Sequence, residues 1–147
     1  MKREILIIGV GNLLRGDDGA GLFVCDQIES LNIIGITTLK VHQLQIELIE
    51  EIIRYSKVLV VDAAIGVDDV FIEEVKPSQS GFASSHHTSP GVLKSLVMKL
   101  YNRNVDLSTC AIPAFNFELG VGLSDETKSY SETAVEKIKK WAIKDSF

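Results

Sequence analysis

The chain has 147 residues, of which 46% are hydrophobic and 24% charged, and its formal net charge is −5. This length suits one domain whose core needs no disulfide bond or structural metal. An acidic chain also lacks the basic face of a typical nucleic-acid-binding protein, so we expect no nucleic-acid partner.

The predicted elements alternate between strands and helices. In chain order they are a strand at 5–8, a helix at 18–30, a strand at 37–41, a helix at 46–55, strands at 57–61 and 70–75, a helix at 90–101, a strand at 105–112 and a helix at 124–144. The pattern predicts an α/β fold, a three-layer sandwich with a mostly parallel twisted sheet of about five strands and helices on both faces. Since the sequence has no linker, low-complexity segment or repeat, we predict one domain over residues 1–147.

Two other features narrow the class of protein. The opening apolar run at 5–9 is far shorter than the roughly 20 residues that cross a bilayer, and no cleavage pattern follows it. We therefore expect a cytoplasmic protein without a membrane partner. Cys25 and Cys110 lie in apolar runs with no Cys-x-x-Cys pair, which predicts two small buried side chains rather than a thiolate zinc site.

The first strand is followed by a glycine-rich loop at 9–19. A Gly-x-Gly turn after a strand is one part of a dinucleotide-binding fingerprint, but Leu14 stands where the third glycine would be. His42, rather than an acid, follows the second strand. We therefore interpret Gly9 and Gly11 as residues that permit a tight turn and a close backbone approach.

Acidic and imidazole side chains gather where predicted strands end. Asp17 and Asp18 follow the first strand, Asp62 ends the third, and His86 and His87 follow the fourth. In open α/β sheets, ligands bind outside the carboxyl ends of the strands. One of the adjacent aspartates can serve the loop and cap the helix, a role that we assign to Asp17, which leaves Asp18 for a ligand.

Each residue also has a purely structural interpretation. Asp18 can be a helix cap, Asp62 a turn acid, and the histidines simply exposed side chains. Taken together, two carboxylates and one imidazole form an oxygen and nitrogen site that suits divalent nickel, zinc, manganese or iron. Three protein ligands leave positions open for water or substrate. No Gly-x-Ser-x-Gly elbow is present, and a serine or cysteine nucleophile has little support.

Four motifs together resemble the hydrogenase maturation endopeptidases. They are the segments at 7–21, 58–63 and 84–87, which contain the acids and histidines above, and the late loop at 117–124. Their order and spacing match over nearly the whole chain. The resemblance implies a metal-dependent endopeptidase that removes the C-terminal extension of a nickel–iron hydrogenase large-subunit precursor.

The resemblance also assigns the site. Residues that grip metal in this family fall on Asp18, Asp62 and a histidine, for which His86 is favoured and His87 is the alternative. These three residues are also the catalytic candidates. The resemblance implies that nickel is supplied by the substrate, that other divalent metals can substitute, and that a water activated by metal or carboxylate attacks the peptide.

One segment departs from the family pattern. Many members carry Asp-Gly-Gly-Thr after the second strand, whereas this chain reads Val41-His42-Gln43-Leu44-Gln45. This departure keeps open a non-catalytic metal-binding assembly factor for a hydrogenase-like complex. A peptidyl-tRNA hydrolase-like enzyme also opens with a Gly-x-Gly-Asn loop, but the Thr-Arg-His-Asn segment expected soon afterwards is missing. Neither the oligomeric state nor the general base follows from the sequence.

Overall fold

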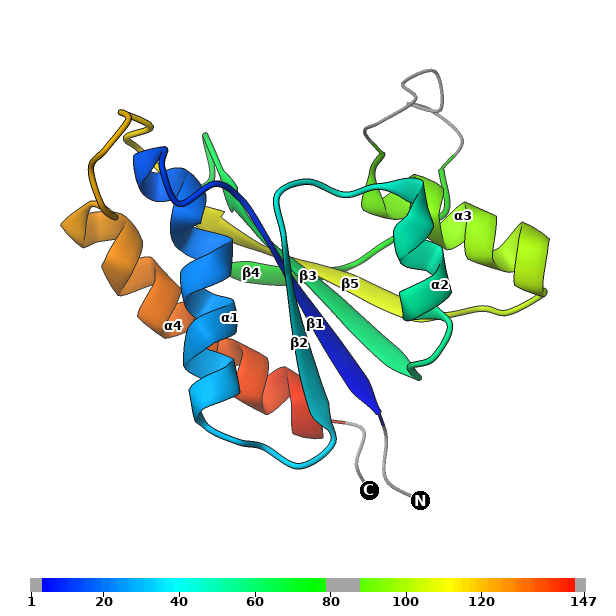
Figure 1. Cartoon of the computed structure of the whole chain (residues 1–147). Helices are drawn as coiled ribbons and strands as arrows, with labels where there is room; N and C mark the ends of the chain where they lie inside the picture. Colours follow the sequence, from blue (N-terminus) through cyan, green and yellow to red (C-terminus); the bar gives the residue numbers. More distant parts are fainter. Residues whose placement is uncertain (1–3, 79–87, 145–147) are drawn as a thin grey trace.

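The computed structural model of the chain describes residues 4–78 and 88–144. Five strands form one twisted sheet in the order β2-β1-β3-β5-β4 (Figure 1). The strands are β1 (Ile5–Val10), β2 (Ile36–Val41), β3 (Lys57–Ala64), β4 (Phe71–Glu74) and β5 (Asp106–Pro113). All neighbouring pairs are parallel except β4 with β5. The apolar run that predicted the first strand is buried along its whole length, as expected for the centre of a parallel sheet.

Helices cover both faces of this sheet (Figure 1). On one face lie α1 (Ala20–Ser30) and α4 (Asp125–Ile143), and on the other lie α2 (Ile49–Ile52) and α3 (Pro90–Tyr101). Two short 3-10 helices, η1 (Gly16–Gly19) and η2 (Ile46–Leu48), precede α1 and α2. Each face has its own apolar core, and the side chains of β1 alternate between them, with Ile7 in one and Ile8 in the other. The predicted three-layer α/β sandwich is confirmed.

Four predicted boundaries were wrong. The first strand was expected to stop before Gly9, whereas β1 continues through Gly9 to Val10. The third strand continues past residue 61, so Asp62 lies within β3 and pairs with Ala111 of β5 instead of ending the strand. The helix expected at 18–30 begins at Ala20, because the preceding residues form η1. The helix expected at 46–55 is only η2 followed by the four-residue α2, since tight turns after Ile52 bring the chain back to β3 at Lys57.

The structure also shows a helix cap and confirms the predicted burial of the two cysteines. Ser124 caps α4, where its hydroxyl accepts a hydrogen bond from the Thr127 N–H at 3.2 Å. Cys25 and Cys110 are free and buried, and burial raises the pKa of the two thiols to about 11 and about 12, respectively. Thiols with pKa values this high are almost wholly protonated at neutral pH, which disfavours them as nucleophiles. Within residues 4–78 and 88–144, no helix is both long enough and apolar enough to cross a membrane.

Candidate functional site

The loop from β1 to α1 is held tightly against the carboxyl end of the sheet. The Asn12 N–H donates to the Asp18 carbonyl oxygen at 3.2 Å, and a Cβ at Gly11 would lie 1.9 Å from that same oxygen. A Cβ at Gly21 would lie 2.4 Å from the carbonyl oxygen of Val61. Glycine at these two positions therefore lets the start of α1 approach the ends of both β1 and β3, which brings η1 beside Asp62.

Asp17 is fully buried and fastens η1 to the loop between β5 and α4. One of its carboxylate oxygens accepts hydrogen bonds from the Phe115 N–H at 2.8 Å, the Asn116 N–H at 2.9 Å and the Ser124 hydroxyl at 2.9 Å. The other accepts from the Ser124 N–H at 2.7 Å. Burial alone would raise the pKa of Asp17, but these donors outweigh it and lower the pKa to about 2.

The role expected for Asp17 is therefore confirmed in part. It organises the loop, as predicted, but its side chain does not cap η1 or α1. Its contact with a helix terminus is instead with Ser124, the N-cap of α4. With Asp17 fully occupied by donors, Asp18 is the half-exposed acid of the pair that is open to a ligand.

Asp18 and Asp62 interact electrostatically at this edge of the sheet. Protein atoms around the Asp62 carboxyl displace hydration and raise its pKa to about 6, although the residue as a whole stays exposed to solvent. The Ala63 N–H hydrogen bond opposes this rise, and the negative charge of Asp18 adds to it. Burial is the largest of these effects on the pKa of Asp62, and the charge of Asp18 is the smallest.

His86 and His87 both lie outside the described residues, so the choice between them stays a prediction. Among the residues that the structure describes, no three His, Cys, Asp or Glu side chains are grouped closely enough to hold a metal ion. The metal site of Asp18, Asp62 and a histidine therefore stays a prediction.

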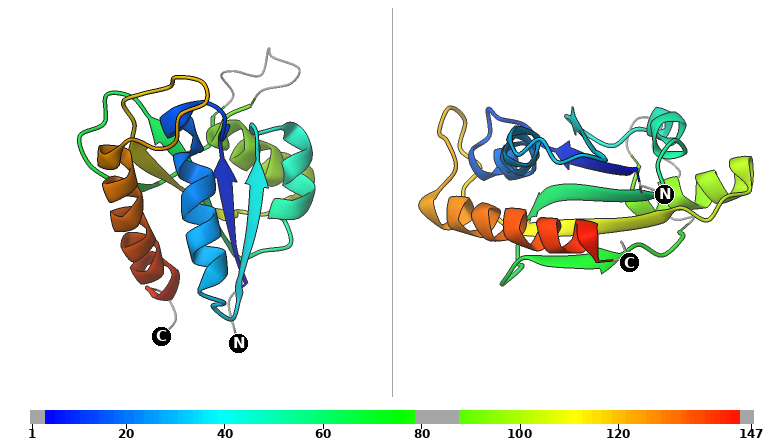
Figure 2. Two further views of the ribbon diagram at one scale, coloured as in Figure 1. Left: turned by 60° about the vertical axis from the view of Figure 1, so that its left-hand side comes forward. Right: turned by 90° about the horizontal axis from the view of Figure 1, so that it is seen from below.

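Large apolar side chains are exposed in the loop before η1 and in the loop after β5, a feature that the sequence interpretation missed. Leu13 and Leu14 are 65% and 68% exposed in the loop before η1. In the loop between β5 and α4, Phe115 and Leu119 are 53% and 76% exposed. The two loops lie side by side, with the Gly120 N–H donating to the Leu14 carbonyl oxygen at 3.0 Å (Figure 2). Apolar residues inside glycine-rich loops were the available signal for this surface.

Known proteins resemble the chain along almost its whole length. No known family profile matches it. A protein of Methanocaldococcus jannaschii named "Putative hydrogenase maturation protease" is 28% identical, and the match covers 93% of this chain and 95% of that protein. The resemblance inferred from the motifs is thus confirmed in a relative found by sequence.

Solved structures share the fold. The hydrogenase maturation protease HycI of Thermococcus kodakarensis has a TM-score of 0.74 at 23% identity, with 98% of this chain and 94% of that chain covered. HybD from the same organism gives 0.71 at 24% identity over 95% and 99% of the two chains. HybD of Escherichia coli gives 0.71 at 19% identity over 97% and 93%. The layers and topology described above are therefore those of HybD-type proteases.

Proposed function

We propose that this protein is an endopeptidase that removes the C-terminal extension of a hydrogenase large-subunit precursor. The carrying observation is that η1, which holds Asp18, packs against β3, which holds Asp62, at the carboxyl edge of the sheet, in a chain that resembles hydrogenase maturation proteases throughout its length. Ligand sites of open α/β sheets lie at this edge.

In this proposal the two carboxylates recognise nickel that is already bound in the substrate. Asp18 and Asp62 supply oxygen donors, and His86 supplies an imidazole nitrogen, with His87 as the alternative. This donor set suits divalent nickel, and zinc or another divalent ion can replace it. Because the pKa of Asp62 is about 6, its carboxylate is mostly ionised and able to bind metal at neutral pH, whereas protons compete with metal below pH 6.

The apolar surface around the acids supports a protein as the substrate. Leu13, Leu14, Phe115 and Leu119 offer exposed apolar area in the two loops that Asp17 joins, which a small polar substrate would not use. Contiguous exposed apolar patches of this kind mark protein contact sites. Docking there would place the scissile peptide near Asp18 and Asp62 and thereby reduce the entropic part of the barrier.

The proposed reaction is hydrolysis of one peptide bond. A water molecule loses a proton to a base as its oxygen bonds to the carbonyl carbon, the C–N bond breaks, and the leaving amine takes up a proton. The products are the mature subunit with a new C-terminal carboxylate and a released peptide. Neither cysteine takes part, because both thiols are buried and neutral.

A non-catalytic assembly factor is the second candidate. The observation that favours it is the segment at 42–45, which replaces the Asp-Gly-Gly-Thr stretch of many family members and connects β2 to η2 at the same edge of the sheet. Such a factor would bind the precursor through the same carboxylates and apolar surface without cutting it.

The test is the intact mass of the nickel-loaded precursor before and after incubation with the protein. Wild type is compared with Asp18→Ala, Asp62→Ala, His86→Ala and His87→Ala, and Glu73→Ala serves as a control in an exposed acid on β4. We expect wild type and the control to release a C-terminal peptide. Both aspartate variants and one histidine variant should lose at least 100-fold in rate, as is typical when a catalytic or ligand group is removed.

Two outcomes would change this assignment. Binding of a verified nickel-loaded precursor without any change of mass would replace the protease by the assembly factor. Full activity of Asp18→Ala or Asp62→Ala would remove that residue from the site, whereas the histidine variant that stays active identifies the other histidine as the ligand.

A further inference from the structure

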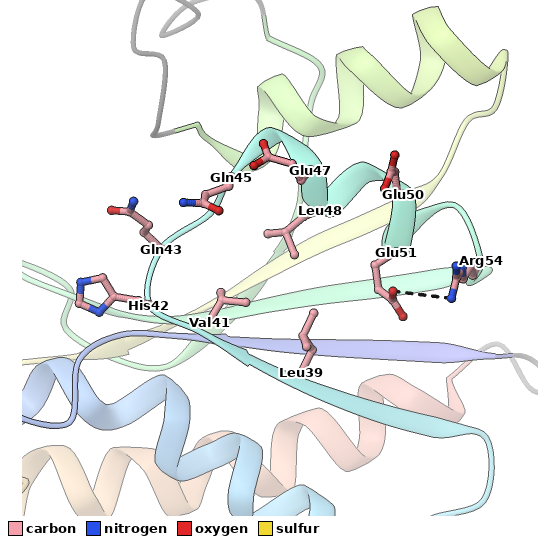
Figure 3. Close-up of a pocket in the computed structure, with 10 residues that line it drawn as sticks. All are labelled: Leu39, Val41, His42, Gln43, Gln45, Glu47, Leu48, Glu50, Glu51 and Arg54. Carbon is pink, nitrogen blue, oxygen red and sulfur yellow. Dashed lines mark ion pairs between the residues drawn. The ribbon is translucent and has the colours of Figure 1, made fainter.

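A groove that neither Asp18 nor Asp62 lines lies between β2 and the helical segment η2–α2 (Figure 3). Its volume is about 550 Å³. The groove exists because α2 has only four residues and leaves the end of β2 partly uncovered. Leu39 and Val41 point from the strand toward Leu48, and all three are only half-buried members of the core on this face.

The groove combines this apolar floor with an acidic helical side. Glu47, Glu50 and Glu51 come from η2 and α2, against a single Arg54. Arg54 is already paired with Glu51 at 3.8 Å. The Tyr55 hydroxyl donates to the same Glu51 carboxylate at 3.4 Å. Glu47 and Glu50 have no ion pair within residues 4–78 and 88–144, so their charges remain uncompensated.

The basic residue of β2 does not neutralise the groove. Side chains alternate along the strand, and Lys40 therefore points to the opposite face, where it pairs with Asp26 of α1 at 2.5 Å. The polar end of the groove is formed by His42, Gln43 and Gln45. A ligand of this groove therefore meets apolar side chains below it and negative charge along the helical side.

The groove also runs along the outermost strand. In the described sheet, β2 pairs only with β1, so its outer edge has unpaired backbone groups. Edge strands of this kind accept an extended segment from another chain. A second copy of this protein is disfavoured as that partner, because its net charge of −5 has the same sign as the groove.

We propose that the β2–α2 groove binds an extended, basic segment of the hydrogenase precursor. The apolar side chains of this segment pack on Leu39, Val41 and Leu48. Its lysine or arginine side chains face Glu47 and Glu50. The inference rests on the proposed function for the identity of the partner. The groove, which includes residues where the sequence departs from the family pattern, would then select the substrate. Cleavage is proposed at other residues, Asp18 and Asp62.

The first test is the kinetics of precursor cleavage by Glu47→Gln/Glu50→Gln. Glu73→Gln/Glu132→Gln is the matched control, since both residues are exposed acids outside the groove. We expect the groove variant to raise KM by about tenfold with kcat within twofold, and the control to leave both unchanged. Raising the salt concentration to about 0.5 M should raise the KM of wild type toward that of the groove variant.

The second test does not need cleavage. An acetylated octapeptide of alternating leucine and lysine, and its leucine–glutamate counterpart, are titrated into the ¹⁵N-labelled protein. The lysine peptide should shift amide signals of residues 39–54 and bind the groove variant at least fivefold more weakly than wild type. Equal binding of both peptides, or shifts confined to other residues, would count against the groove.

The two tests separate the failure of this inference from failure of the proposed function. If wild type cleaves the precursor and the groove variant keeps its KM, the groove inference is overturned whatever the peptides do. A fall in kcat without a rise in KM overturns it as well. If wild type cleaves no precursor, the protease proposal fails, and the peptide titration alone decides whether the groove takes basic segments.

Discussion

The connections after β1 and after β2 leave the same edge of the sheet, yet they are built in opposite ways. The first is locked by glycines that allow close backbone approach and by Asp17, whose carboxylate accepts four hydrogen bonds. The second ends in a one-turn helix and leaves an open groove with uncompensated glutamates. Fixed geometry suits the chemistry proposed at Asp18 and Asp62, whereas an adaptable surface suits the choice of partner.

The largest expected effect on the free energy of unfolding comes from removing the charge of Asp17. In Asp17→Asn, an amide group replaces one carboxylate oxygen and must face donors from the loop at 115–124. We expect a loss of about 3 kcal/mol in the free energy of unfolding, because buried donors lose their acceptor. Denaturant titration measures this loss, and Glu73→Gln is the control for a removed surface charge. A loss below about 1 kcal/mol would show that the loop does not depend on the carboxylate.

A smaller effect is expected from the glycine contact between α1 and β3. In Gly21→Ala, the new Cβ would lie 2.4 Å from the Val61 carbonyl oxygen and 2.6 Å from that of Val10. Both neighbours are strand backbone, so the helix must move, at a cost of about 2 kcal/mol. Gly122→Ala is the control, because nothing lies within 4 Å of a Cβ there. Equal melting temperatures for the two variants would contradict the tight packing of α1 on the sheet.

Low pH should also destabilise the protein, because Asp17 becomes protonated and its hydrogen bonds to the loop at 115–124 weaken. The pKa of Asp17 is about 2 in the fold, below the ordinary value of 3.8. The stabilisation is therefore complete above pH 4 and disappears as the pH falls through 2, and it amounts to about 2 kcal/mol. Unfolding curves between pH 5 and 2 should show this loss in wild type and a smaller one in Asp17→Asn. Parallel pH dependences of the two proteins would refute it.

Asp62 should show the opposite dependence on pH. Its pKa of about 6 lies above the ordinary value, so the fold favours the protonated form and loses stability as the pH rises from 4 to 6. Asp62→Asn removes the charge and should stabilise the protein at pH 8 by about 1 kcal/mol, since water still reaches the carboxyl and screens it. The gain should vanish at pH 4. A variant that is less stable at pH 8 would mean that Asp62 supports the fold rather than a site.

The sequence predicted the regular part of this molecule and missed what depends on contacts between distant segments. Apolar runs and helical spacing located all five strands and the helices at 90–101 and 124–144, because burial imposes those periods locally. The continuation of β3 through Asp62 depends on pairing with β5, which is far away in sequence. The donors to Asp17 come from residues about 100 positions later, so no local pattern indicates them.

The smallest expected effect on the free energy of unfolding comes from changing the glutamates of the groove. Glu47 and Glu50 have no ion pair in the described part of the chain, and they lie three residues apart on one short helical segment, where like charges repel. Glu47→Gln/Glu50→Gln should therefore change the free energy of unfolding by less than about 0.5 kcal/mol, in contrast to Asp17→Asn. The measurement is denaturant titration at the ionic strength of the kinetic assay. A loss above 1 kcal/mol would mean that these carboxylates hold η2 and α2 in place, and a rise in KM would then report a disturbed fold rather than a lost contact with the precursor.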